Sequence, residues 1–292
     1  MKKNYIYAVT AVLLWATVPA LSKWLISGIP NMETLSISSF LAFLFLLLMN
    51  TANGTVRKLK HFSLREYLIM AGLGFLGSFL YSALYYYGLA RLSSQEACIL
   101  NYLWPIMLVL FSCPILKEKM SAVKITAMGC CFTGILILSA GGGGGASASA
   151  APGIVSCILA AACYGLFSVL NKKANLDQNV SMMMVWLTTS VCSLAAGMAS
   201  ETWIPIRGMQ WAGFLWLGIL ADAAAYLLWA LALKGARNVA SIANLAYLTP
   251  VLSLAVSAVF LKEKIQPRAV GALAFIIGGI LFQVFAQRRQ EG

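Results

Sequence analysis

Asp222 is the residue of this sequence best suited to do chemistry, because it is the only charged residue in a long apolar stretch, 208–233. Tyr226 and Trp229 follow it at spacings of four and seven residues. On a helix these spacings place all three side chains on one face. The pattern therefore predicts a helix face that combines one carboxylate with two aromatic side chains.

Three functions and one structural role are open to this carboxylate. It can clamp an ammonium group of a substrate, carry a coupled proton, or pair with Lys23 or Lys172. In the structural role, Asp222 is protonated and hydrogen-bonded inside a helix bundle. A carboxylate near the centre of a bilayer costs at least ~2.5 kcal/mol, so we expect it to face a wet cavity or a cationic partner.

Aromatic and amide side chains recur at helical spacing in the other apolar stretches. Aromatic faces offer apolar surface to many substrates, and an Asn side chain can bond both ends of a zwitterion. The residues that we expect to line a substrate cavity are Trp15, Tyr81, Tyr85, Asn101, Trp104, Tyr164, Asp222, Tyr226, Trp229, Asn244 and Tyr247. The alternative for the rings is helix packing, and for the two Asn residues a hydrogen bond to a neighbouring helix.

Prolines interrupt several of the same stretches. A proline inside a helix leaves the carbonyl four residues before it without a partner, and in a carrier such a break can act as a hinge. Pro19, Pro105 and Pro250 are the predicted hinges, and simple helix kinks are the alternative.

Other chemical signals are weak. His61 is the only histidine, and the seven cysteines include no Cys-x-x-Cys pair, so we predict no metal site, no cofactor and no catalytic residue. The glycines of 72–77 match a dinucleotide-binding pattern, but no strand precedes them, and close helix packing explains them better.

The composition identifies the environment of these residues. Hydrophobic residues make up 61% of the 292 residues and charged residues only 10%, whereas a soluble domain has about 25% charged residues. The charges cannot cover a soluble globule, which excludes a soluble enzyme. The apolar runs are continuous rather than alternating, which excludes a membrane β-barrel.

Charge-free stretches mark ten expected membrane helices, because about 20 apolar residues cross a bilayer as a helix. The stretches are 4–22, 34–56, 67–90, 97–116, 125–140, 152–171, 178–200, 208–233, 238–261 and 269–287. The predicted fold class is an all-α integral membrane protein with ten transmembrane helices.

The two halves of the chain repeat one another. At an offset of 145 residues, 101–105 aligns with 246–250 and the Leu-Lys-Glu-Lys of 116–119 with that of 261–264. We therefore predict two five-helix repeats, with the glycine run in the linker between them. The predicted domains are a first repeat over 1–140, a linker over 141–152 and a second repeat over 153–292. Because five is odd, the second repeat enters the membrane from the opposite side, and inverted repeats are typical of alternating-access carriers.

The cations indicate the orientation. Fifteen of the 21 Lys and Arg residues fall on one side of the ten-span scheme. Since Lys and Arg concentrate in cytoplasmic loops, both termini are predicted to be cytoplasmic. The net charge of +12 is then a topology signal, and no nucleic-acid partner is expected.

Ten spans in two halves, with Pro105 and Pro250 each followed by Lys-Glu-Lys, resemble the drug/metabolite transporter superfamily, EamA type. Within it, 101–105, 225–229 and 247–253 are similar to the YddG-like aromatic amino acid exporter branch. The resemblance implies a central cavity lined by helices of both halves, and export of amino acids or similar small metabolites.

The expected function is a secondary transporter that exports amino acids, aromatic or other small neutral ones, or related metabolites by alternating access. We expect it in the plasma (bacterial inner) membrane, with a small-molecule substrate and the lipid bilayer as its partners; the oligomeric state is open, and a monomer is compatible with the sequence. The alternatives are a multidrug or nucleotide-sugar carrier of the same superfamily, an intramembrane enzyme using Asp222, and a scaffold or receptor without transport activity.

Overall fold

The computed structural model describes residues 2–117, 122–140, 150–234 and 244–291. Every regular element in these ranges is helical. The predicted all-α class is therefore confirmed for the described part of the chain.

The helices divide into two series. The first comprises α1 (Lys2–Ile26), α2 (Asn31–Ala52), η1 (Thr55–His61), α3 (Leu64–Gly74), η2 (Phe75–Leu80), α4 (Tyr81–Arg91), α5 (Ser94–Asn101), α6 (Trp104–Leu116) and α7 (Ala122–Ala140). The second comprises α8 (Ala150–Ala174), α9 (Gln178–Ser200), α10 (Met209–Leu215), η3 (Trp216–Ala224), α11 (Ala225–Lys234), η4 (Asn244–Tyr247), α13 (Leu248–Phe260) and α14 (Pro267–Glu291).

Seven described helices are long and apolar enough to cross a membrane. They are Lys3–Ile26, Asn31–Ala52, Leu64–Arg91, Ser94–Leu116, Ala150–Ala174, Gln178–Ser200 and Met209–Trp229. Three shorter apolar helices, Ile125–Gly134, Leu248–Phe260 and Pro267–Phe282, overlap the other three predicted spans. The chain is thus a multi-pass helical protein, and the number ten stays a prediction.

Two of the long spans contain a π-helical segment, a wider turn that is frequent at functional sites. η2 lies between α3 and α4, and η3 lies between α10 and α11. A third span, 94–116, is broken at Tyr102 and Leu103, where α5 ends and α6 begins.

The three predicted hinge prolines occupy different positions. Pro19 lies inside α1, whereas Pro105 is the second residue of α6 and Pro250 the third residue of α13. Pro105 and Pro250 therefore begin helices, where proline is tolerated because its missing N–H has no helical partner. The carbonyl of Ala246, four residues before Pro250, instead accepts a hydrogen bond from the Tyr102 hydroxyl at 3.4 Å.

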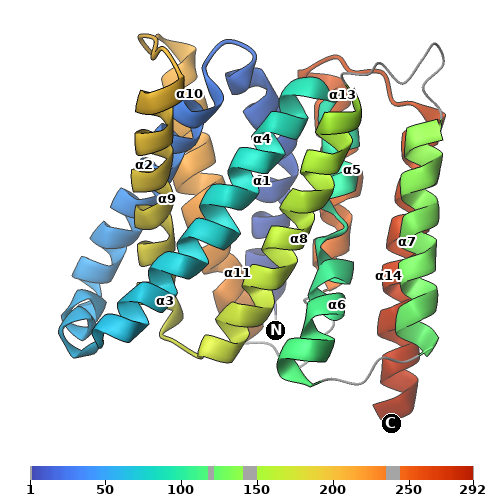
Figure 1. Cartoon of the computed structure of the whole chain (residues 1–292), viewed down its shortest axis with the longest axis horizontal. Helices are drawn as coiled ribbons and strands as arrows, with labels where there is room; N and C mark the ends of the chain where they lie inside the picture. Colours follow the sequence, from blue (N-terminus) through green and yellow to red (C-terminus); the bar gives the residue numbers. More distant parts are fainter. Residues whose placement is uncertain (1, 118–121, 141–149, 235–243, 292) are drawn as a thin grey trace.

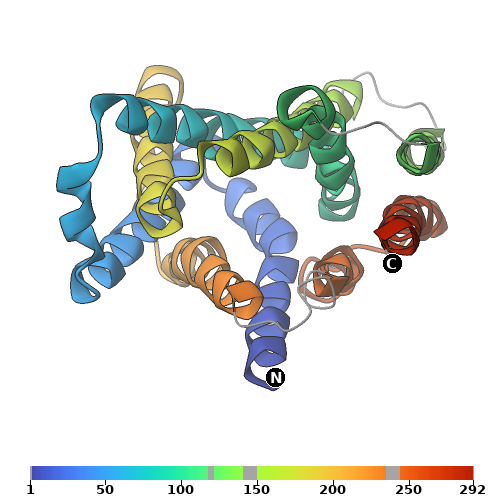
Figure 2. The same ribbon diagram turned by 90° about the horizontal axis from the view of Figure 1, so that it is seen from below.

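The two helix pairs that pack most extensively run antiparallel. α2 packs along α9, and the beginning of α2 meets the end of α9, where the Met32 N–H donates to the Glu201 carboxylate at 3.0 Å. At the other end of the pair, Asn50 Nδ2 donates to the carbonyl of Asn179 at 3.2 Å. In α7 and α14, Gly134 lies against Ala272 and Ala127 lies against Gly279, so these helices form the second antiparallel pair, set to one side of the other helices (Figures 1 and 2).

Helices of the two series interleave in the rest of the bundle. α1 packs against α11 and α13, whereas α8 packs against α4, α5 and α6. The largest cluster of buried apolar side chains joins α4, α5 and α8 with α7 and α14. In Figure 1 the beginning of α1 and the end of α14 lie at the same end of the bundle.

Candidate substrate cavity

A cavity of about 250 Å³ lies in the interior of the bundle. Its walls come from α1, α2, η2, α4, α5 and α6 of the first series and from α8, α9, η3, α11, η4 and α13 of the second. Typical pockets for drug-sized ligands measure ~300–1,000 Å³, so this space suits a molecule the size of an amino acid.

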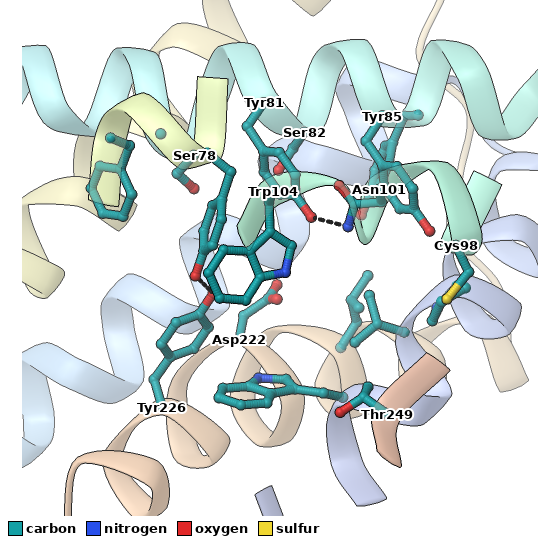
Figure 3. A pocket seen from close by; sticks show the side chains of 18 of the residues that line it. Ser78, Tyr81, Ser82, Tyr85, Cys98, Asn101, Trp104, Asp222, Tyr226 and Thr249 are labelled. Atoms are coloured by element: carbon teal, nitrogen blue, oxygen red, sulfur yellow. Dashed lines mark hydrogen bonds between the residues drawn. The ribbon is translucent and has the colours of Figure 1, made fainter. Parts of the chain in front are cut away.

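Most of the predicted cavity residues surround this one space. The lining includes Trp15, Tyr81, Tyr85, Asn101, Trp104, Tyr164, Asp222, Tyr226 and Trp229, together with the proline Pro19. Asn244 and Tyr247 belong to η4, but their side chains lie outside the described part of the structure. Figure 3 shows several of these side chains pointing into the cavity, with the Asp222 carboxylate below the indole of Trp104 in that view.

Aromatic rings from opposite series contact one another across the walls. Trp15 of α1 lies 5.2 Å from Tyr226 of α11, between ring centroids, because α1 packs along α11. Tyr164 of α8 lies 5.2 Å from Tyr81 of α4 and 5.3 Å from Trp104 of α6. These edge-to-face and tilted geometries are the favourable ones for aromatic pairs.

Hydrogen bonds fix the orientation of several of these rings. Asn101 Nδ2 donates to the Tyr81 hydroxyl at 3.0 Å, and the hydroxyls of Tyr164 and Tyr226 are 3.3 Å apart. The Trp15 indole N–H donates to the carbonyl of Ala221 at 3.2 Å. The aromatic wall is therefore held by contacts between α5 and α4, between α8 and α11, and between α1 and η3.

Asp222 lies in the π-helical segment η3, partly exposed to the cavity. It makes no hydrogen bond or ion pair with any residue that the structure describes. Its pairing with Lys23 or Lys172, one of the roles left open by the sequence, does not occur. Lys23 Nζ instead donates to the carbonyls of Leu89 and, at 2.8 Å, Leu92, because α1 ends beside the end of α4. Lys172 is exposed at the end of α8.

Comparison with known proteins identifies the family. The model of the EamA-like transporter family matches the chain twice, over residues 2–140 and 151–285. The chain belongs to the EamA-like transporter family. This confirms the family that the motifs indicated, and it makes the chain a membrane transporter rather than an enzyme using Asp222.

Two curated relatives match this EamA-like transporter over nearly its full length. "Aromatic amino acid exporter YddG" of Ancylobacter novellus is 26% identical over 96% of both chains. "Uncharacterized transporter YoaV" of Bacillus subtilis is 23% identical over 100% of both chains. A solved crystal structure covers 100% of both chains with a TM-score of 0.71 at 24% identity, which shows a shared fold.

Several lining residues of this EamA-like transporter were not predicted. The polar or aromatic ones are Ser78, Ser82, Tyr86, Cys98, Tyr102, Phe167, Trp186, Thr249 and Ser253. Ser78 and Ser82, and also Thr249 and Ser253, have the four-residue spacing of a helix face, which is the signal that indicated Asp222 and Tyr226. Tyr86 and Tyr102 are direct neighbours of predicted residues, and spacing alone places them on a different face.

The charge of the cavity wall is asymmetric. Asp222 is the only Asp or Glu among the described lining residues, and these residues include no Lys, Arg or His. No group of three or more metal-ligand side chains occurs in the ranges that the structure describes. The arrangement therefore offers one carboxylate, several tyrosine hydroxyls and a largely aromatic surface.

Proposed function

We propose that this EamA-like transporter is a secondary carrier that exports amino acids, aromatic or other small neutral ones, or related metabolites by alternating access. The observation that carries the proposal is the interior cavity lined by helices of both series, with aromatic contacts between them. A cavity at such an interface is where a two-sided carrier holds its substrate.

The proposal includes ten membrane helices in two inverted five-helix repeats, divided as 1–140 and 153–292. The antiparallel pairing of α2 with α9 and of α7 with α14 supports the inversion, since corresponding helices of a parallel repeat would run in the same direction. The excess of Lys and Arg on one side favours cytoplasmic termini in the plasma (bacterial inner) membrane.

Pro19, Pro105 and Pro250 are the proposed hinges of this motion. Pro19 lines the cavity from inside α1, and the other two begin α6 and α13 beside it. Pro19 lacks an N–H inside α1, so this helix can bend there with one hydrogen bond fewer to break. Pro105 and Pro250 lie in the first turns of α6 and α13, so motion there changes the angle to the segment before each helix.

The composition of the wall supports the proposed substrate class. Trp15, Tyr81, Trp104 and Tyr164 offer aromatic faces to an apolar side chain, and one relative is named as an aromatic amino acid exporter. Nucleotide sugars fit less well, because phosphates favour Lys and Arg and the described lining has neither.

Counterflow in proteoliposomes tests the proposal. Vesicles containing the purified chain are loaded with one unlabelled amino acid and then given the same amino acid in labelled form outside. L-Tryptophan, L-phenylalanine and L-leucine form the test panel, and a nucleotide sugar is the comparison. We expect labelled amino acid to accumulate above protein-free vesicles for at least one member of the panel. No accumulation of any amino acid would overturn the proposal.

A further inference from the structure

We propose that the cavity holds its substrate by an organic ammonium group, placed between Asp222 and three neighbouring rings. These rings, called the aromatic cage below, are Trp15, Tyr226 and Trp229. Aromatic amines that lack a carboxylate then bind at least as tightly as the corresponding amino acids. The inference rests on the proposed transport function and names the substrate class of the same site.

The first support is the unpaired carboxylate. Asp222 faces the cavity, and no described residue bonds it. Lys23 is engaged with two carbonyls of α4's end and Lys172 is exposed elsewhere. A charge at membrane depth is costly unless it has a partner, and an ammonium group of the substrate supplies that partner.

The second support is the geometry of the aromatic cage. Asp222, Tyr226 and Trp229 share one helix face, and the Trp15 ring lies 5.2 Å from that of Tyr226 and 5.4 Å from that of Trp229. The Trp15 ring is inclined by 69° to the Tyr226 ring and by 57° to the Trp229 ring, so its face points in a different direction from each of theirs. A cation within about 6 Å of such ring centroids is attracted by their negative faces.

The third support is that the described cavity lining has no cationic side chain to bind a substrate carboxylate. A carboxylate on the substrate needs a cation or several donors when it leaves water. The described lining contains no Lys, Arg or His, so only neutral donors, such as the second N–H of Asn101 and the hydroxyls of Ser78 and Thr249, can meet such a group there. An amino acid is therefore bound through its ammonium end and its ring, and its carboxylate adds no favourable contact to a charged residue.

Three indole compounds separate the two charges. L-Tryptophan carries both charges, tryptamine carries only the ammonium and indole-3-propionate only the carboxylate. Their affinities for the purified full chain are measured as ligand-dependent shifts of the unfolding temperature. We expect tryptamine to bind at least as tightly as L-tryptophan and about tenfold or more tighter than indole-3-propionate. Binding of indole-3-propionate as tight as that of tryptamine, or tighter, would overturn the inference.

Substitutions locate the effect. Asp222→Asn is expected to weaken tryptamine about tenfold or more and to leave indole-3-propionate no weaker. Asp222→Glu, which keeps the charge, is expected to retain tryptamine binding. Binding by this variant would show that a substitution at position 222 does not by itself prevent folding. Asp177→Asn is the matched control, since that acid lies outside the cavity. An unchanged tryptamine affinity in Asp222→Asn would contradict the assignment.

A test variant and a matched control variant probe the aromatic cage. Trp229→Leu is expected to weaken tryptamine by several-fold through loss of a cation–π contact, whereas Trp211→Leu, at a 46% exposed tryptophan of α10 outside the cavity, is expected to change nothing. If L-tryptophan shows counterflow while tryptamine fails to bind, the ammonium inference fails and the transport proposal stands. If no amino acid shows counterflow, the transport proposal itself fails.

Discussion

Most of the charged side chains whose hydrogen bonds are described in this transporter connect the end of one helix to the end of another. Lys23 donates to the carbonyls of Leu89, near the end of α4, and of Leu92, just after it. Glu201 accepts from N–H groups at the beginning of α2, and Glu263 accepts from the Ser94 N–H at the beginning of α5. Asp222 differs from these residues because it faces the cavity without a described partner. This contrast is why we assign the substrate contact to Asp222 and a structural role to the others.

Asp177 makes one of these contacts between helix ends, and the pH dependence of stability tests how much its charge contributes. Burial disfavours its ionisation, but hydrogen bonds from Lys58 Nζ at 2.6 Å and from the N–H groups of Val180 and Asn179 outweigh it, so the pKa of the carboxyl lies below its ordinary value. A depressed pKa contributes stability at neutral pH that is lost on acidification through the pKa of the folded state.

The variant for this test is Asp177→Asn, which keeps a capping side chain for α9 and removes the charge. Because Lys58 is 57% exposed, the expected loss is below ~1 kcal/mol at pH 7. Unfolding temperatures in detergent should show a gap between wild type and variant at pH 7 that narrows below about pH 4. A gap that widens on acidification would contradict this account.

The site could be predicted from the sequence only where helical spacing holds. Asp222, Tyr226 and Trp229 line the cavity because four- and seven-residue spacings keep side chains on one face. Tyr86 and Tyr102 could not be chosen in this way, since each adjoins a predicted residue and reaches the cavity from a neighbouring face. The partners of Lys23 also required the fold, because Leu89 and Leu92 are distant in sequence.

Small residues control how closely the helices approach. A Cβ atom at Gly165 of α8 would lie 2.7 Å from the backbone N of Leu108 and 2.9 Å from the carbonyl carbon of Met107. These are backbone atoms of α6, so they cannot move aside without shifting that helix. Close approach of this kind is how membrane helices gain packing energy.

Gly165→Ala tests the α8–α6 contact. Overpacking of this kind typically costs about 1–3 kcal/mol, so we expect a lower unfolding temperature in detergent. Gly278→Ala in α14 is the control, because nothing lies within 4 Å of the added Cβ atom there. Equal unfolding temperatures of the two variants would show that the helices are not in this contact.

The apolar stretches predicted the positions of the helices but not all of their internal irregularities. The charge-free stretches 67–90 and 97–116 fall within α3–η2–α4 and α5–α6. The π-helical segment η2 could not be predicted, because its residues are about as apolar as those around it. The break at Tyr102 and Leu103 lies just before Pro105, where the sequence predicted an interruption. Within η2, Gly77 packs directly against Phe167 of α8, a contact that the sequence alone does not show.

In the described part of the chain, helices of both series line the cavity. The sequence predicted a repeat at an offset of 145 residues, and the family model matches twice along the chain. The structure adds the antiparallel pairs α2–α9 and α7–α14 and the interleaving of α1 and α8. The sequence repeat did not predict which helices of one half pack against which helices of the other, because the offset between two similar segments says nothing about their contacts.

Access to the cavity from both sides of the membrane tests the central claim most directly. Ser82→Cys places a thiol in the cavity wall on α4 with little change in volume, in a variant whose seven native cysteines are replaced. A membrane-impermeant thiol reagent is applied to right-side-out and inside-out vesicles, with and without L-tryptophan. Alternating access predicts modification from both sides, slowed by the amino acid. Modification from one side only, in every condition, would contradict the account.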